Sequence, residues 1–309
     1  MYRRILAILI VVLSFSALAY AADDEVGATF AKTSEYLNAT KSSITTNATQ
    51  GFENGYLLVK GEAGPRPDAR TPGLRRIQAI TAAKAVAYRE LASVINGVAV
   101  AGETTVENLE LSSDRIRTAV SGIIKGAVVV SEDYNDQEGI ALVLVKIGMN
   151  GPGSLGDTLY KNLKSDPSMA SAVATTAPKF APPKAEVAAE KPAIIAAGYD
   201  GLIIDATSQS FRPALINRIY SPNGEVIYDP SKISQKVLVD QGCGEYTNSI
   251  DKAKAALGSR GVNNPLVVSA VKSVGNTDLQ VSEKDGVDIF TANQKSPFLA
   301  SAKVAFVLK

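Results

Sequence analysis

Apolar positions in the first half of the chain change their period along the sequence. An apolar run at 56–63 predicts a short strand, and apolar residues then recur every three or four positions over 77–94, which predicts an amphipathic helix. Thr71-Pro72 is typical of a helix start, because threonine caps the first turn and proline at the first helical position loses no hydrogen bond. Asn96-Gly97 predicts a left-handed end to this helix.

The following residues predict another strand, another helix and a hairpin. Small and β-branched residues over 98–109 predict one long strand, and Ser112-Ser113-Asp114 predicts the start of a helix that ends at Gly126. Apolar runs at 127–130 and 140–147 enclose a polar turn, which predicts a β-hairpin. The order β-α-β-α-β-β predicts a two-layer α/β sandwich and an α+β class for the chain.

Residues 194–309 predict a second α+β domain with a mostly antiparallel sheet. The last strand, 303–308, is expected at a sheet edge, where a partner or a second copy could add a strand. The predicted strands are 201–206, 215–220, 225–228, 266–274 and 303–308, a hairpin joins 281–282 to 287–290, and 231–257 forms two helical pieces broken near 242–244.

The N-terminus predicts an export signal. Arg3-Arg4 precedes nine apolar residues, which are too few to span a bilayer, and Ala19 and Ala21 occupy the small-residue positions before a cut between Ala21 and Ala22. An uncleaved N-terminal anchor is the alternative. A lipoprotein needs a cysteine just after the apolar run, and the single cysteine is Cys243, so no covalent lipid anchor is predicted.

These features divide the chain into five parts. Residues 165–193 hold five of the 14 prolines and many alanines, so an extended spacer that sets the separation of two domains is expected there. The parts are a signal peptide (1–21), an N-terminal polar segment with one weak helix or none (22–54), an α/β domain (55–150), an exit segment with the linker (151–193) and a C-terminal α+β domain (194–309).

Composition narrows the function classes. The chain has no histidine and one cysteine, which excludes Ser-His-Asp and Cys-His nucleophilic catalysis, histidine-ligated metals and an internal disulfide. The formal charge of +1 gives no electrostatic footprint for nucleic acid. No cofactor is predicted and the chain is expected not to be an enzyme, with a hydrolase built on paired carboxylates as the remaining enzymatic alternative. Cys243 is expected to be buried.

A few charged residues are candidates for a site. Asp205 ends an apolar strand and Arg212 and Arg218 follow it, so a structural ion pair among them is expected, or an Asp205 that accepts backbone N–H bonds; a catalytic base is the competing hypothesis.

Three other motifs give weaker evidence for a binding site. Residues 151–156 match G-x-G-x-x-G, but no second strand follows, so a flexible domain exit is expected rather than a dinucleotide site. The acidic residues of 133–138 lack calcium-loop spacing and indicate a solvated turn. Residues 248–262 lack the arginine of a peptidoglycan-binding helix and predict an ordinary amphipathic helix.

Residues 55–150 contain a strand end at 60–63, an alanine-rich helix at 76–91, Gly97-Val98 opening a strand, and a hairpin closing on 143–147. On these features the segment resembles a bacterial envelope domain family. Its members include twenty-kilodalton outer-membrane lipoproteins, FlgP and the N-terminal domain of the flagellar assembly protein FlgT. The resemblance implies a structural or assembly role in the envelope and no catalytic residue.

The sequence therefore predicts an exported, non-enzymatic envelope protein in the periplasm or at the outer-membrane periphery. It is expected to dock onto other envelope proteins, possible partners being flagellar basal-body or outer-membrane components and the chain itself. The alternative is a soluble periplasmic module that binds a small ligand or glycan, which a compact apolar pocket with a few convergent polar groups would favour.

Overall fold

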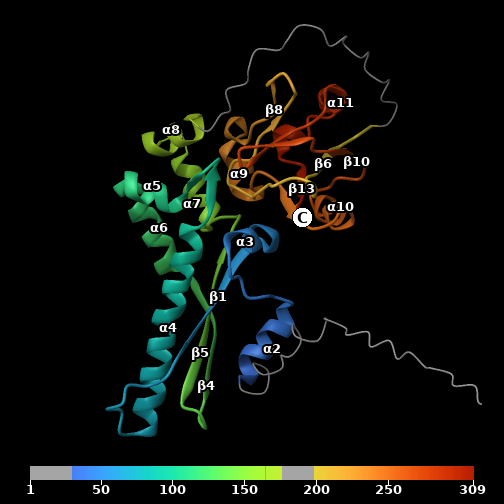
Figure 1. The fold of residues 1–309 in the computed structure, drawn as a ribbon. Coiled ribbons are helices and arrows are strands. Elements are labelled where there is room, and N and C mark those ends of the chain that lie inside the picture. The colour runs from blue at the N-terminus through green and yellow to red at the C-terminus, as the bar shows by residue number, and fades with distance from the viewer. Residues whose placement is uncertain (1–29, 164, 176–197) are drawn as a thin grey trace, which may run out of the picture.

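The computed structural model describes residues 30–163, 165–175 and 198–309. The predicted signal peptide with its cut at Ala21–Ala22, and the linker from 176 onward, lie outside the described residues. The mixed α+β class is confirmed: helices and several small sheets occupy both halves of the chain (Figure 1).

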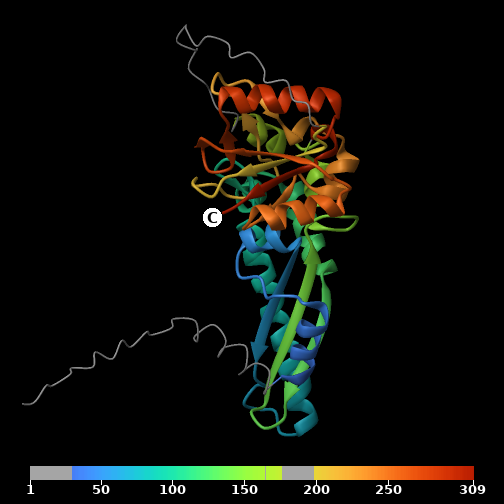
Figure 2. The same ribbon diagram turned by 90° about the vertical axis from the view of Figure 1, so that its right-hand side faces the viewer.

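The first half is built on a long antiparallel sheet with the strand order β1-β5-β4. Helix α4 lies along one face, and α2 covers the other, where Phe30 packs on Leu58, Leu142 and Leu144 (Figure 2). These layers extend away from the second half of the molecule. The elements are α2 (Ala31–Thr40), α3 (Ala48–Asn54), β1 (Tyr56–Ala63), α4 (Pro72–Asn96), β4 (Val128–Asn135) and β5 (Ile140–Gly148).

The predicted central helix and hairpin are confirmed. The Thr71 side chain caps α4 by accepting a hydrogen bond from the Leu74 N–H, and Pro72 begins the helix. Gly61 of β1 lets this helix approach closely, since a Cβ there would lie 2.2 Å from the Ala83 carbonyl oxygen. The predicted left-handed end of α4 is wrong, because Gly97 has a φ of −75°, which is a right-handed conformation.

The long strand predicted at 98–109 is wrong. Gly102 turns the chain at a φ of 57°, and Thr105 forms a reciprocal capping box with Asn108 that starts a helix instead. The segment forms a two-stranded sheet and a short helix. These elements are β2 (Ala99–Ala101), β3 (Thr104–Thr105) and α5 (Val106–Ser112), followed by the predicted helix α6 (Asp114–Gly126) with Ser113 as its cap.

The second half holds two four-stranded sheets. The sheet with the order β10-β6-β13-β9 is parallel throughout, and the sheet with the order β11-β12-β7-β8 is mixed. The mostly antiparallel prediction is wrong, because four of the six strand pairs in these sheets are parallel: β10–β6, β6–β13, β13–β9 and β12–β7. A helix connects β9 to β10 within one sheet, and such a helical crossover makes the two strands run in the same direction. The strands are β6 (Gly201–Asp205), β7 (Ile219–Tyr220), β8 (Val226–Tyr228), β9 (Glu245–Thr247), β10 (Pro265–Ser269), β11 (Lys272–Val274), β12 (Asp278–Gln280) and β13 (Val304–Val307).

Two further predictions for this half are corrected. The C-terminal strand β13 lies inside its sheet between β6 and β9, so it is not an edge strand. The hairpin predicted at 281–290 is a helix, because the Ser282 side chain caps it through the Asp285 N–H. The remaining elements are η1 (Pro230–Lys232), α9 (Gln235–Gln241), α10 (Ile250–Ser259), α11 (Glu283–Lys295) and η2 (Leu299–Ser301).

The two halves are in direct contact. Leu215 and Ile216 donate backbone hydrogen bonds of 3.0 and 2.9 Å to the carbonyls of Ala99 and Val100, and Gly151 donates one of 2.7 Å to Val239. Buried residues from both halves form one apolar cluster. The separation of the halves is therefore set by this contact and not by a spacer.

Residues 151–175 belong to the junction between the halves. Helix α7 (Leu155–Asn162) is largely buried there, and the Tyr160 hydroxyl donates to the Leu215 carbonyl at 3.0 Å. Helix α8 (Pro167–Thr175) occupies the start of the segment predicted to be an extended spacer. The predictions of a flexible exit and of an extended spacer are thus wrong for these residues, because their apolar side chains are part of the shared core.

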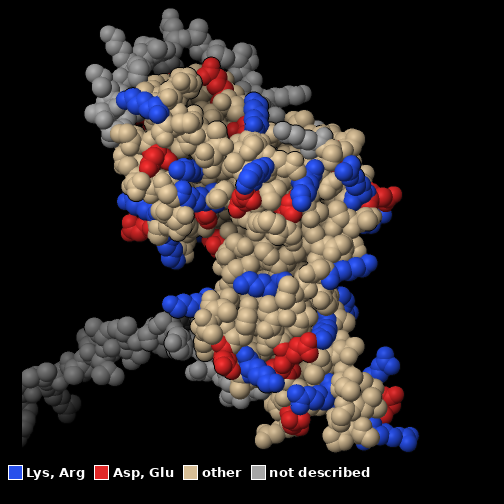
Figure 3. Space-filling view, turned by 180° about the vertical axis from the view of Figure 1, so that it is seen from behind, with Lys and Arg blue, Asp and Glu red and all other residues tan. Residues whose placement is uncertain are grey.

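Charge is distributed evenly over the visible surface. On the face shown in Figure 3, Lys and Arg side chains are interspersed with Asp and Glu, as the formal charge of +1 leads one to expect. In the described parts of the chain, no helix combines the length and the apolar character needed to cross a membrane.

Candidate functional site

The ion pair predicted among Asp205, Arg212 and Arg218 does not form. Asp205 Oδ1 instead accepts hydrogen bonds from the backbone N–H and the hydroxyl of Thr207 at 3.0 and 2.7 Å. Arg212 Nη2 donates to the Gly102 carbonyl at 3.4 Å, across the junction of the halves. The alternative prediction for Asp205, that it accepts backbone N–H bonds, is confirmed.

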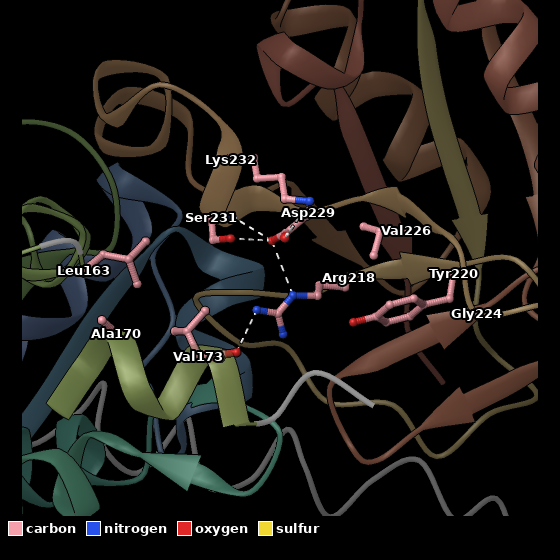
Figure 4. A pocket seen from close by; sticks show the side chains of 11 residues that line it. Leu163, Ala170, Val173, Arg218, Tyr220, Gly224, Val226, Asp229, Ser231 and Lys232 are labelled. Carbon is pink, nitrogen blue, oxygen red and sulfur yellow. Dashed lines mark hydrogen bonds and ion pairs between the residues drawn. The ribbon is translucent and has the colours of Figure 1, made fainter. Parts of the chain in front are cut away.

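Arg218 is the centre of a buried charge network. Its side chain is 4% exposed, Nε lies 3.3 Å from Asp229 Oδ1, and Nη1 lies 3.8 Å from Asp278 Oδ2. Nη2 donates to the Val173 carbonyl at 2.9 Å, in the last turn of α8. Figure 4 shows the guanidinium between Asp229 and α8, with the Tyr220 hydroxyl pointing toward it. Arg218 therefore ties α8 to the second half of the chain.

Burial dominates the electrostatics of this network. Desolvation raises the pKa of Asp278 to about 6, although the Arg218 backbone N–H and guanidinium act in the opposite direction. Burial likewise raises the pKa of Tyr220, and the nearby Asp278 carboxylate adds to the rise. Two carboxylates thus lie around one guanidinium, which the sequence did not indicate, because Asp229 and Asp278 are distant from Arg218 in the chain.

A pocket of about 590 Å³ opens beside Arg218. Lys232 reaches toward Asp229 from its rim, and its side chain is 74% exposed. The pocket combines apolar side chains with polar and charged ones, as small-molecule sites do. Its walls are Leu163, Ala170, Val173, Ala174, Arg218, Tyr220, Gly224, Val226, Asp229, Ser231 and Lys232.

A second concavity, of about 610 Å³, lies between β8 and α11. We call it the β8–α11 groove. Phe290 is 63% exposed and Val226 is 45% exposed at its walls, so large apolar side chains face solvent there. The groove is lined by Ser221, Glu225, Val226, Ile227, Glu283, Gly286, Val287, Phe290, Asn293 and Leu299. The sequence pattern does not indicate this groove, because it predicts a hairpin over 281–290 where the structure has a helix.

Cys243 lies in a buried polar cluster and not at a surface. The residue is 2% exposed, and its Sγ is 2.9 Å from the Tyr246 hydroxyl and 3.5 Å from the Ala214 carbonyl oxygen. Burial raises the pKa of the Cys243 thiol and of the Tyr246 hydroxyl. The prediction of a buried cysteine is confirmed, and the thiol is poorly suited to act as a nucleophile.

The glycine-rich motif has a structural role. Ser154 caps α7, and Asp157 Oδ2 accepts from the Gly153 N–H and binds Lys161, each at 2.9 Å. A local helix start thus accounts for this motif.

The acidic segment at the end of β4 is equally structural. Asn135 Oδ1 accepts from the N–H groups of Gln137 and Glu138, and Asp133 Oδ2 accepts from the N–H of Lys32 at the start of α2. Over the residues described by the structure, no group of three or more Asp, Glu or Cys side chains is arranged to hold a metal ion. The predicted helix within 248–262 is confirmed as α10.

Part of the chain is similar to a known domain family. Residues 201–309 match the model of the second domain of Tp0624 from Treponema pallidum. The match starts at β6 and runs to the end of the chain, so it contains Arg218, Asp229, Asp278 and the whole β8–α11 groove. No curated protein matches the chain.

Proposed function

We propose that this protein is an exported, non-enzymatic component of the bacterial envelope that docks onto other envelope proteins. Its role is structural or assembly-related, at the outer membrane or the flagellar basal body. The observation that carries the docking function is the β8–α11 groove, where Phe290 and Val226 expose apolar surface beside a concavity. The envelope location rests on the export pattern around Ala21–Ala22 and on the resemblance of residues 55–150.

The energetic argument concerns Phe290. Full burial of a phenylalanine side chain stabilises a contact by about 1.5–3 kcal/mol, and Phe290 is still 63% exposed. A partner that covers this ring therefore gains roughly 1–2 kcal/mol from one residue. Aromatic side chains, phenylalanine among them, are enriched at protein interfaces relative to the rest of the surface. The groove thus supplies an anchor for docking without needing strong charge.

Photo-crosslinking in the envelope tests this function. A photo-crosslinking amino acid replaces Phe290 in one strain and Leu111 in another; Leu111 is 75% exposed on α5 and serves as the matched control. We expect a defined adduct with an envelope protein from position 290 and none from position 111. Identical adducts from both positions, or no adduct from position 290, would contradict docking through this groove.

The Arg218 pocket supports a second candidate, the periplasmic module for a small ligand or glycan. Its volume of about 590 Å³ is in the range of small-molecule sites, which is roughly 300–1,000 Å³. Native mass spectrometry of the purified protein tests it. A bound small molecule that is lost in Ala170→Leu, which fills a wall of this pocket but not of the groove, would favour this candidate.

A further inference from the structure

The floor of the β8–α11 groove is apolar and shaped by a glycine. Ile227, Val287 and Leu299 line it, and Gly286 lies between them. A Cβ at Gly286 would lie 3.3 Å from Ile227 Cδ1, so the missing side chain keeps the floor open and the helix close to β8. Phe290 follows one helical turn later and forms a wall. The groove is therefore shaped to accept an apolar side chain.

The charged residues that line the groove are both acidic. Glu225 immediately precedes β8 and Glu283 lies in the first turn of α11, and no Lys or Arg is among the lining residues. The Asn223 amide donates a hydrogen bond to Glu283 Oε2 at 3.2 Å. The neighbouring Lys284 is bound to Asp288 at 2.6 Å within the helix. A partner with positive charge beside its apolar side chain complements this rim.

The shape of the partner follows from β8. This strand ends the four-stranded sheet β11-β12-β7-β8, and Val226 and Ile227 of the strand line the groove. In an extended segment, alternate side chains point toward the same side. If such a segment lies along this terminal strand, one of these side chains enters the groove, and the alternate side chains before and after it reach the rim with Glu225 and Glu283.

We propose that the β8–α11 groove binds an extended segment of a partner protein in which an apolar side chain is flanked by lysine or arginine. The apolar side chain packs on Ile227, Val287 and Phe290. The flanking cations lie against Glu225 and Glu283. This inference deepens the proposed docking function and rests on it, because it states the chemistry of the partner at the same groove.

Fluorescence anisotropy with three labelled nine-residue peptides tests the inference on the purified protein. The first peptide has a central leucine flanked by lysines, the second has glutamates in place of the lysines, and the third has serine in place of the leucine. The protein variants are Phe290→Ser and the double variant Glu225→Gln with Glu283→Gln; Leu111→Ser is the control for a lost exposed apolar residue. All of these positions are partly or fully exposed, so the variants are expected to fold.

We expect the first peptide to bind at least tenfold more tightly than either of the others. The double variant should remove the difference between the lysine and glutamate peptides, Phe290→Ser should weaken binding about five- to thirtyfold, and Leu111→Ser should change nothing. Equal binding of the lysine and glutamate peptides overturns the inference, as does binding of the lysine peptide that Phe290→Ser leaves unchanged. A dimer in sedimentation that Phe290→Ser dissociates would also overturn it, since a second copy then occupies the groove.

The docking function and the proposed chemistry of the partner can be refuted independently of each other. A crosslink from position 290 without preference for the lysine peptide keeps docking and rejects the stated partner chemistry. Failure of the crosslink together with failure of all peptides rejects both.

Discussion

Replacing Arg218 by methionine removes the buried cation that lies beside both Asp229 and Asp278. The side chains of Arg218, Asp229 and Asp278 are 4%, 10% and 3% exposed. Methionine keeps much of the volume but leaves both carboxylates without their buried partner. Removal of one member of a buried ion pair costs about 3–5 kcal/mol. We expect Arg218→Met to lower the free energy of unfolding at pH 8 by about this amount.

The loss should depend on pH with a definite sign. Burial already raises the pKa of Asp278 to about 6 from the ordinary 3.8, and without Arg218 it rises further because the attraction of the guanidinium is gone. A carboxyl with a higher pKa in the folded state binds a proton preferentially there, so folding gains stability as the pH falls. In the unaltered protein this group therefore costs stability as pH rises from about 4 to about 6. Arg218→Met should recover part of its loss at pH 5.

Urea unfolding followed by far-ultraviolet circular dichroism measures both effects, since the chain has no tryptophan for fluorescence. Lys232→Met is the matched control, because that ammonium is 3.9 Å from Asp229 but 74% exposed, and it should change stability by less than about 1 kcal/mol. A loss under about 1 kcal/mol for Arg218→Met at pH 8 would refute the reasoning. So would a loss that is equal at pH 5 and pH 8.

Three further predictions concern other buried or close contacts. Gly61→Ala should destabilise the protein by about 1–3 kcal/mol or more in urea unfolding, because its Cβ would lie 2.2 Å from the Ala83 oxygen, whereas Gly73→Ala, with nothing within 4 Å, should be nearly neutral. Asp133→Ala should speed hydrogen exchange in α2, since it removes the carboxylate that accepts from Lys32 N–H at 2.9 Å; the loss of a cap is about 1 kcal/mol, and equal exchange in the variant would contradict this. Cys243 should react with a thiol reagent only in denaturant, because the thiol is 2% exposed and its pKa is raised; native labelling at the rate of a free thiol would disprove its burial.

Elements with strong local signals were predicted well. Helix α4 combines a regular apolar repeat with a threonine cap, and the hairpin β4–β5 combines two apolar runs with a polar turn. These signals act between residues a few positions apart, so a linear pattern contains them. Helix α11 also carries one, Ser282 followed three residues later by Asp285, which the hairpin interpretation overlooked.

The candidate site was much less accessible from sequence. The sequence indicates that Asp205 and Arg218 need partners, but it does not identify those partners. Asp205 accepts hydrogen bonds from Thr207. Arg218 contacts Asp229, Asp278 and the end of α8. A buried charge requires a counter-charge, and that requirement is visible in the sequence. Which carboxylate supplies the counter-charge depends on which segments the tertiary fold brings next to the arginine.

By itself, the amino-acid sequence determined the α+β class, the ends of its best helices, the burial of the single cysteine and the exclusion of histidine chemistry. Only the tertiary structure decided that β13 lies between two parallel strands, that α7 and α8 join the halves, and that β8 and α11 leave a groove beside Phe290. The physical reason is range: periodicity and capping act within a few residues, whereas strand neighbours and buried partners are chosen by the packing of distant segments into one core.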